Sequence, residues 1–260
     1  MKANVVQAGC VLIGLSAFGA EPPNRLTADE VRDGWKLLWD GKTFDGWCHA
    51  DGRPVDTGWS VKDGALTLKP NRIWEGEGKW AWRPVENGRA KGGKADIMTV
   101  AEYRDFDLRF SFKMEKGANS GVKYYYDPKR NLGTALEYQV LDPAHPVPPH
   151  MTAEQFENRR VASLYQFYAA HATKHLRKRG EWNEGRIVSR GRHVEHWLNG
   201  VRVVSYERGS EGFRAALRRT KWGDAKFSVR VPWGEADTGH ILLQDHEDAI
   251  SFRDLKILSL

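Results

Sequence analysis

The centre of the chain carries an amide, an ammonium group, a phenol, a carboxylate and a second amide close together in sequence: Asn119, Lys123, Tyr125, Glu137 and Gln139. They belong to two adjoining runs of aromatic and β-branched residues bounded by Asn, Gly, Asp and Pro, a composition typical of neighbouring strands. Side chains alternate between the two faces of a strand, so Lys123 is expected to share a face with Tyr125, and Glu137 with Gln139. A sheet with its polar face in water shows the same alternation. The concentration of donors and acceptors favours instead a patch that binds a ligand with many hydroxyl groups, such as a sugar.

Short strands separated by turn residues are expected to position this patch. Asp63-Gly64 and Asn199-Gly200 each separate two alternating apolar runs and predict two-residue hairpins. Residues 106–114 alternate cleanly and predict a core strand with the inward set Phe106, Leu108, Phe110 and Phe112. More than ten such strands, with no dinucleotide-binding or phosphate-loop pattern, favour an all-β fold: a two-sheet antiparallel jelly-roll sandwich with a few short helices.

The segments between these strands predict shorter or less regular elements. A capping box at Thr27 begins a short helix, and residues 211–219 predict a second one. Residues 70–94 are rich in Gly and Trp and have no period, so we expect a long loop that could lie over the binding face. Within that loop Trp82 is a candidate platform for a sugar ring. Residues 162–169 predict another strand.

The composition describes a globular chain with a modest excess of positive charge. The net charge of +6 is spread over 40 Lys and Arg and 34 Asp and Glu, with the densest basic run at residues 174–179, which argues against a nucleic-acid partner. Residues 1–20 hold an apolar run that ends in small residues, which predicts a signal peptide, a secreted or periplasmic location and a single domain over residues 21–260. The run is too short to span a bilayer, so no stable membrane insertion is expected. Removal of the signal would leave Cys48 without a partner for an intrachain disulfide.

Eight short motifs occur in order over residues 26–260. They are Gly34-Trp-Lys-Leu-Leu-Trp-Asp-Gly-Lys-Thr-Phe-Asp-Gly-Trp47, Trp59-x-Val-x-Asp-Gly-Ala-Leu66, Tyr103-x-Asp-Phe-Asp-Leu108, Asn119-Ser-Gly121, Glu137-Tyr-Gln-Val-Leu-Asp142, Gly180-Glu-Trp-Asn183, His196-Trp-Leu-Asn-Gly200 and His240-Ile-x-Leu-Gln-Asp-His246. Together they resemble the 3-keto-disaccharide hydrolase domain family, formerly a domain of unknown function. The resemblance implies a concanavalin-like jelly roll, often secreted by glycan-degrading bacteria, that cleaves glycosides whose sugar carries a ketone at C3.

Two positions depart from the pattern of that family. Glu247 follows Gln-Asp-His where the family usually has Gly, and Asp254 stands where it usually has Asn. We expect the second change to be structural. The first adds a carboxylate beside the expected site and leaves metal binding there open.

The resemblance also implies a chemistry for the polar residues. A C3 ketone makes the C2 proton acidic, so cleavage could proceed by loss of the C1 oxygen and then addition of water to the enone. His246 and Glu137 are the candidates for base and acid, in an undecided order, and Lys123 is a candidate to stabilise the enolate. The residues expected to hold sugar hydroxyls are Asn119, Gln139 and Gln244, beside the aromatic candidates Tyr125 and Trp82.

Other interpretations of these residues remain open at this stage. Glu137 could instead be salt-bridged to Lys123, and His246 could be a turn residue. An ordinary glycosidase needs two carboxyl groups about 5.5 or 6.5–9.5 Å apart. Asp142 lies about 16 Å along the strand from Glu137, on the opposite face, so these two cannot be that pair, whereas Asp245 could form it with Glu137 because the sequence does not give the strand order.

No cofactor is certain from the sequence, but a divalent cation could be held by carboxylates and an imidazole near the patch: Asp142, His145, Asp245 and Glu247. Asp142 could equally cap the end of its strand. The expected partner is a small carbohydrate, the 3-keto glycoside. The main alternative is a non-catalytic carbohydrate-binding module with the same fold, and a structural interaction domain is disfavoured by the polar residues on consecutive strands.

Overall fold

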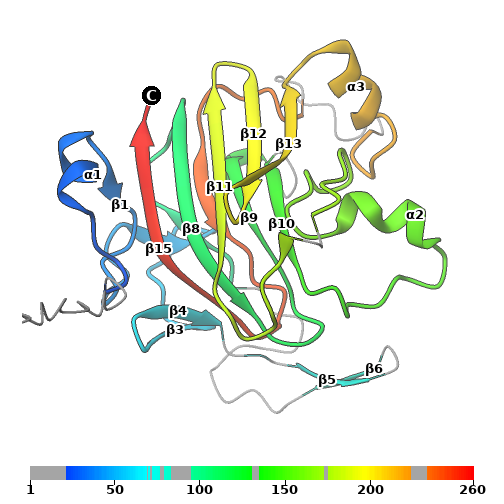
Figure 1. Cartoon of the computed structure of the whole chain (residues 1–260), viewed down its shortest axis with the longest axis horizontal. Coiled ribbons are helices and arrows are strands. Elements are labelled where there is room, and N and C mark those ends of the chain that lie inside the picture. The colour runs from blue at the N-terminus through cyan, green and yellow to red at the C-terminus, as the bar shows by residue number, and fades with distance from the viewer. Residues whose placement is uncertain are drawn as a thin grey trace, which may run out of the picture.

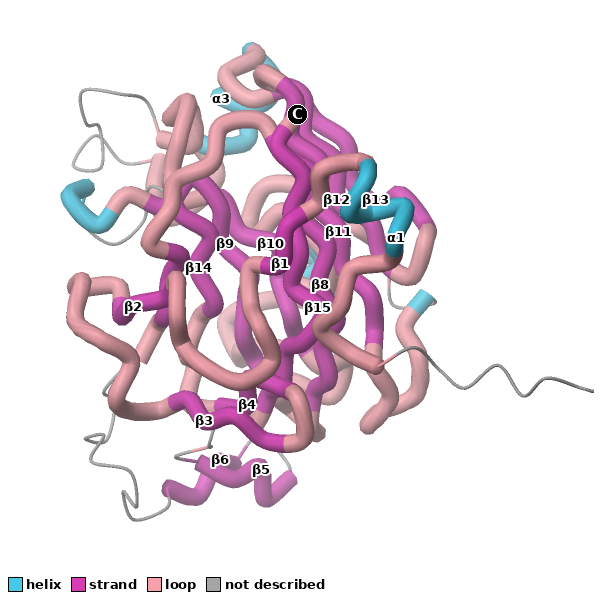
Figure 2. Tube along the Cα trace, turned by 90° about the vertical axis from the view of Figure 1, so that its left-hand side faces the viewer, coloured by secondary structure: helices cyan, strands magenta, loops and turns pink. Residues whose placement is uncertain are grey.

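Two antiparallel sheets form the body of the protein, as the computed structural model shows (Figure 1). The structure describes residues 22–68, 70, 95–130, 135–172, 175–223 and 233–260, together with the backbone of residues 72–76 and 79–82. Turned by 90°, the two sheets are seen as separate layers (Figure 2). The predicted all-β sandwich is therefore confirmed, whereas residues 1–20, the expected signal peptide, lie outside the described residues.

The larger sheet has eight strands in the order β13-β12-β11-β8-β15-β4-β3, with β1 paired to β15. Its strands are β1 (Lys36–Leu37), β3 (Trp59–Lys62), β4 (Ala65–Leu68), β8 (Phe106–Met114), β11 (Asn183–Arg190), β12 (His193–Leu198), β13 (Val201–Glu207) and β15 (Ile250–Ser259). The smaller sheet has five strands in the order β10-β9-β14-β7-β2. These are β2 (Trp47–His49), β7 (Ile97–Thr99), β9 (Asn119–Tyr126), β10 (Leu136–Leu141) and β14 (His240–Leu243).

Helices are short and lie at the periphery of the sheets. They are α1 (Ala28–Arg32), η1 (Pro128–Arg130), α2 (Ala153–Phe156), η2 (Glu157–Arg159) and α3 (Glu211–Leu217). The predicted capping box at Thr27 begins α1, with reciprocal hydrogen bonds between Thr27 and Glu30. No helix in the described part of the chain is long and apolar enough to cross a membrane.

The core lies between the two sheets and follows the predicted alternation. On β8 the four inward residues are at most 2 % exposed: Phe106, Leu108, Phe110 and Phe112. The facing side chains of the smaller sheet include Val122 and Tyr124 on β9 and Leu136 and Tyr138 on β10. The residues between these, such as Lys123 and Glu137, therefore project from the opposite face of the smaller sheet.

The predicted two-residue hairpins are confirmed by their backbone angles. Asp63 and Gly64 have φ of 50° and 66°, and Asn199 and Gly200 have φ of 48° and 82°. Two positive φ values are what a type I′ turn requires, and Asn, Asp and Gly adopt them at low cost.

Two segments differ from their sequence prediction. Part of the expected loop at residues 70–94 forms a hairpin of β5 (Arg72–Gly76) and β6 (Lys79–Trp82). Residues 162–169 do not form a regular strand but make backbone bonds along the outer edge of β10, where Gln139 N–H binds Ser163 O and Tyr165 N–H binds Glu137 O. Ala162 and Gln166 have φ of 62° and 68°, so the chain turns at both ends and covers the edge of the sheet only briefly.

The departure at Asp254 has a structural explanation, as expected. Its φ is 52°, a conformation that Asn and Asp both tolerate, at a register shift in β15. The carboxylate accepts hydrogen bonds from the Asn24 backbone at 2.7 Å and from Ser111 Oγ at 3.0 Å. It therefore ties the N-terminal segment to the larger sheet.

A buried polar network crosses the core beneath the smaller sheet. Ala162 O accepts a hydrogen bond from His196 Nδ1 at 2.9 Å, so Nε2 of the neutral ring is the acceptor for the Tyr124 hydroxyl at 2.8 Å. Tyr206 Oη lies 2.5 Å from Tyr124 Oη and completes the chain of donors. Burial lowers the pKa of His196 from 6.5 to about 4.

This network predicts that the free energy of unfolding depends on pH in the acid range. The unfolded chain takes up the proton on His196 before the folded one, so the free energy of unfolding should fall as pH decreases from about 6.5 to 4 and be unaffected by this group above and below that window. The loss should total about 3–4 kcal/mol, since the pKa falls from 6.5 to about 4 and one pKa unit corresponds to about 1.4 kcal/mol. Urea unfolding at pH 7, 5 and 4 measures it. His196→Gln should be less stable at pH 7 but lack this dependence, and an unchanged pH profile in the variant would contradict the assignment.

Candidate functional site

A hollow of about 190 Å³ opens on the face of the smaller sheet that points away from the core. It brings together six of the residues singled out in the sequence: Asn119, Lys123, Glu137, Gln139, Gln244 and His246. β9 supplies the first two, β10 the next two, and the segment after β14 the last two. Three neighbouring strands of one sheet thus converge on a single polar depression.

Lys123 on β9 lies directly opposite Glu137 on β10. Two residues further along, Gly121 lies opposite Gln139. Glu137 is only 7 % exposed, whereas Lys123 is partly exposed. Although they are cross-strand neighbours, no ion pair joins these two described side chains, and in the described part of the chain the Lys123 ammonium makes no hydrogen bond. The alternative in which Glu137 is salt-bridged to Lys123 is therefore not realised.

Gly121 provides the space that the Glu137 side chain occupies. A Cβ built on Gly121 would lie 2.9 Å from both Cγ and Cδ of Glu137 and would also overlap its Oε1. Carbon atoms do not approach so closely, so any larger residue at this position would displace the carboxylate. The glycine is therefore needed for the close approach of the side chain, since it has no positive φ.

The amide side chains form the other wall of the hollow. Gln139 Nε2 donates to Asn119 Oδ1 at 2.7 Å and to Ser120 O at 3.2 Å. Gln139 Oε1 and Gln244 Oε1 are both buried and have no hydrogen-bond partner in the described structure. A buried acceptor without a donor is costly, and two of them in one depression suit a ligand that brings hydroxyl groups.

His246 is held by a tightly bonded turn after β14. Both carboxylate oxygens of Asp245 accept backbone N–H groups, Oδ1 from Glu247 and Oδ2 from Ala95, each at 2.7 Å. The Asp245 N–H in turn binds Asp96 Oδ1 at 2.7 Å. Asp245 is fully buried and does not line the hollow, so it does not form a glycosidase pair with Glu137 there.

The remaining metal candidates make structural contacts. Asp142 accepts the backbone N–H groups of Gly117 and Ala144 at 3.0 and 2.9 Å and lies 3.3 Å from the Arg179 guanidinium, so it caps the end of its strand. Gly117 O accepts a hydrogen bond from His145 Nδ1 at 2.7 Å. Among the described residues no three His, Cys, Asp or Glu side chains are grouped as a metal site.

Glu247 occupies a position that its backbone makes better suited to glycine. Its φ is 67°, in the left-handed region that costs most residues about 1–2 kcal/mol. The side chain is 8 % exposed and is not among the residues that line the hollow. The family preference for Gly at this position thus has a conformational reason.

Tyr125 does not share a face with Lys123, so this expectation from the sequence is wrong. Its φ is 56°, and a register shift between β9 and β14 occurs at this point, so the regular alternation of β9 is interrupted. Tyr125 is fully buried, with its hydroxyl bonded to Arg104 O at 2.6 Å and near Ser189 Oγ at 2.7 Å. The next residue, Tyr126, lines the hollow instead.

Five further lining residues were not predicted: Asp96, Ala135, Tyr165, Lys221 and Trp222. Tyr165 is positioned by the segment along the edge of β10, and its ring meets that of Trp222 edge-on at 6.0 Å. Trp222 in turn stacks on Trp233 at 4.6 Å. The high Trp content was the only signal in the sequence for such a wall. Trp82 ends β6, and its side chain lies outside the described residues.

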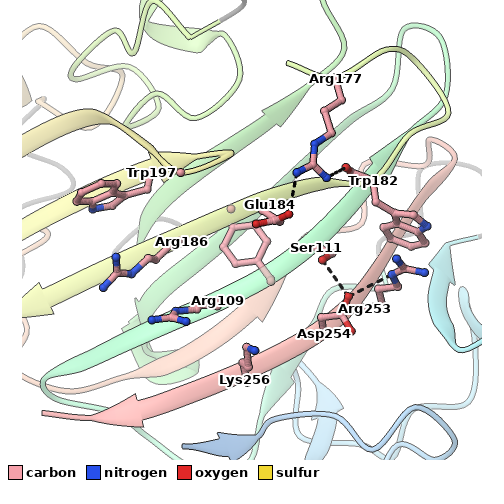
Figure 3. A pocket seen from close by; sticks show the side chains of 13 residues that line it. Arg109, Ser111, Arg177, Trp182, Glu184, Arg186, Trp197, Arg253, Asp254 and Lys256 are labelled. Carbon is pink, nitrogen blue, oxygen red and sulfur yellow. Dashed lines mark hydrogen bonds and ion pairs between the residues drawn. The ribbon is translucent and has the colours of Figure 1, made fainter. Parts of the chain in front are cut away.

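A larger hollow, about 530 Å³, lies on the outer face of the eight-stranded sheet (Figure 3). Its charged side chains are largely paired: Arg186 donates to both oxygens of Asp107 at 2.8 and 2.6 Å, and Arg177 to Glu184 at 2.8 Å. The Trp182 ring is covered by the Arg253 guanidinium at 4.2 Å. These features are those of a solvated sheet face with cross-strand ion pairs, so the smaller hollow is the better candidate site.

The chain resembles known proteins along most of its length. Residues 34–258 match the model of a family described as the 3-keto-alpha-glucoside-1,2-lyase-like domain. A 3-keto-disaccharide hydrolase of Bacteroides thetaiotaomicron is 27 % identical over 243 residues, which cover 86 % of this chain and 78 % of the relative.

Two solved structures from Parabacteroides distasonis, both described as candidate glycosyl hydrolases, have the same fold. One superposes with a TM-score of 0.72 at 28 % identity and covers 92 % of this chain and 99 % of its own. The other has a TM-score of 0.60 at 26 % identity and covers 87 % and 99 %.

The contact between Gly121 and Glu137 gives a structural prediction. Gly121→Ala should displace the Glu137 side chain from its position over β9, which a crystal structure of the variant would show. Gly212→Ala is the matched control, because its added Cβ meets only Ser210 Oγ, at 3.9 Å. An unmoved Glu137 in Gly121→Ala would mean that the strands separate instead and that the glycine does not hold the carboxylate.

Proposed function

The chain belongs to the 3-keto-alpha-glucoside-1,2-lyase-like domain family, and from that premise we propose that it cleaves the glycosidic bond of 3-keto glycosides at the hollow on the smaller sheet. The observation that carries the proposal is the convergence there of a carboxylate, an imidazole and an ammonium group: Glu137, His246 and Lys123. Beside them lie two buried amide oxygens that lack donors. A sugar offers hydroxyl donors to such oxygens.

The proposed reaction begins with removal of the proton on C2. The ketone at C3 accepts the electron pair as an enolate, and collapse of the enolate forms the C1=C2 double bond as the C1–O bond breaks. The leaving oxygen takes a proton, and the C3 ketone is restored. Water can then add across C1=C2, so that the net reaction is hydrolysis.

Three side chains supply what these steps need. Glu137 and His246 act as the base at C2 and the acid at the leaving oxygen, or in the reverse order. Lys123 stabilises the negative charge that develops on the C3 oxygen. Asn119, Gln139 and Gln244 orient the sugar through its hydroxyl groups.

The first test is release of a chromogenic leaving group from a 3-keto-glucoside. Glu137→Gln and His246→Ala should each lower kcat by about 10²- to 10⁴-fold, the usual contribution of a positioned acid or base. Glu184→Gln and His193→Ala are matched controls, because both residues lie on the larger sheet outside this hollow and should leave the rate unchanged. Each protein is assayed with and without a chelator, since the sequence leaves a divalent cation open.

Other outcomes of this assay would contradict the proposal. Tight binding of the glycoside with no release by the parent protein would favour a carbohydrate-binding module. Rates unaffected by both variants would locate the chemistry elsewhere in the chain.

A second test separates elimination from direct displacement at C1. If the C2 proton is removed before the C1–O bond breaks, a substrate with deuterium at C2 should react more slowly than the protium compound. In a separate reaction of the protium compound in D₂O, solvent deuterium should appear at C2 of the product. The matched control is the glucoside with deuterium at C4, which should show no effect. Equal rates, together with a product free of deuterium at C2, would exclude the enolate route.

A further inference from the structure

A second hollow, about 380 Å³, adjoins the candidate site. The two share four lining residues, Asn119, Gln139, Tyr165 and Lys221, so they form one continuous depression. The first hollow alone is small for a ligand pocket, whereas pockets for small molecules commonly reach 300–1,000 Å³. A glycoside with its sugar in the first hollow has room for its leaving group in the second.

The described residues that line the second hollow carry charge of one sign. They include three cationic side chains, Arg159, Arg219 and Lys221, and no Asp or Glu. The first hollow contains both signs, with Glu137 and Asp96 beside Lys123 and Lys221. The electrostatic character therefore changes from mixed to cationic along the depression.

The two arginines of this surface are not neutralised by described carboxylates. Arg159 donates only to neutral oxygens, Gln155 O and Asn158 Oδ1, each at 2.9 Å. The guanidinium of Arg219 makes no hydrogen bond or ion pair with any residue that the structure describes, and only its backbone N–H is bonded, to Ala216 O at 3.0 Å. This contrasts with the outer face of the larger sheet, where Arg177 and Arg186 each have a carboxylate partner.

The floor between the cations is apolar, with Leu141, Pro148, Met151 and Phe156. Phe156 and Leu141 are each 4 % exposed, so most of their surface is packed within the protein. An apolar floor with a cationic rim complements a ring that bears an anionic group.

We propose that this second hollow binds the leaving group of the glycoside and selects leaving groups that carry an anionic substituent, a carboxylate or a sulfate. The inference rests on the proposed function for the identity of the sugar. Beyond that function, the preferred leaving groups are anionic, and Arg159 and Arg219 determine this specificity. Lys221 lines both hollows.

The test compares aryl 3-keto-glucosides whose rings are unsubstituted, carboxylated or sulfated. At low salt kcat/KM should be higher for both anionic substrates, and Arg219→Gln and Arg159→Gln should each reduce that preference by about two- to fivefold, as expected for exposed ion pairs. The neutral substrate should be unaffected. A preference for only one anionic substrate would identify the group that is recognised. Raising the ionic strength to 1 M, where the Debye length is about 3 Å, should reduce the preference of the parent protein.

Arg218→Gln is the matched control. Arg218 is the exposed neighbour of Arg219 and does not line the hollow, so the variant loses the same charge without changing the subsite. If Arg218→Gln and Arg219→Gln reduce the preference equally, the effect comes from the net charge of the protein and the proposed subsite is wrong. No preference for anionic substrates in the parent protein would overturn it as well.

Binding of the free carboxylated and sulfated phenols, measured by calorimetry, tests the subsite without turnover. They should bind more tightly than phenol, and more weakly to Arg219→Gln than to Arg218→Gln. If no glycoside is cleaved but this order of affinities holds, the reaction proposed above fails and the anion subsite stands. If glycosides are cleaved but the affinities do not follow this order, the proposed reaction stands and the anion subsite is wrong.

Discussion

The antiparallel register of β9 and β10 is the constraint on which the candidate site depends. It sets Glu137 opposite Lys123 and Gln139 opposite Gly121, so a carboxylate, an ammonium group and an amide emerge together on one face. A slip of one residue in either strand would turn the polar side chains of that strand into the core and bring Tyr124 of β9 or Tyr138 of β10 to the surface. The large aromatic side chains of the core thus fix the positions of the polar ones, because burial of those rings holds the register.

This arrangement explains how much of the site could be predicted from the sequence. The period of two in β8, β9 and β10 is a local property, and the hairpins at Asp63 and Asn199 are specified by residues that accept positive φ. The motifs that resemble a known family then connected β10 with the distant His246. Those signals were sufficient for the sandwich and for six residues of the hollow.

The parts that could not be predicted depend on irregular backbone or on long-range contacts. The interruption of β9 at Tyr125 exchanges Tyr125 for Tyr126, and nothing in the run of three tyrosines indicates where it occurs. Tyr165 reaches the site because a non-periodic segment bonds to the edge of β10. Trp222 does so because it stacks on Trp233, a contact between loop residues that no pattern announces.

The two faces of the molecule use the same residue types to different effect. On the larger sheet, arginines pair with carboxylates such as Asp107 and Glu184, and the buried groups of its described residues that have no hydrogen-bond partner are donors, Nε of Arg109 and of Arg253. Around the smaller sheet the ammonium of Lys123 and the guanidinium of Arg219 make no ion pair with a described residue, and two amide oxygens are buried without donors. Desolvated acceptors raise the free energy of the unliganded protein, and a ligand that supplies hydroxyls removes that cost on binding. The two faces therefore differ in the kind of polar group that is left without a partner in the protein, and not in how many polar groups each face carries.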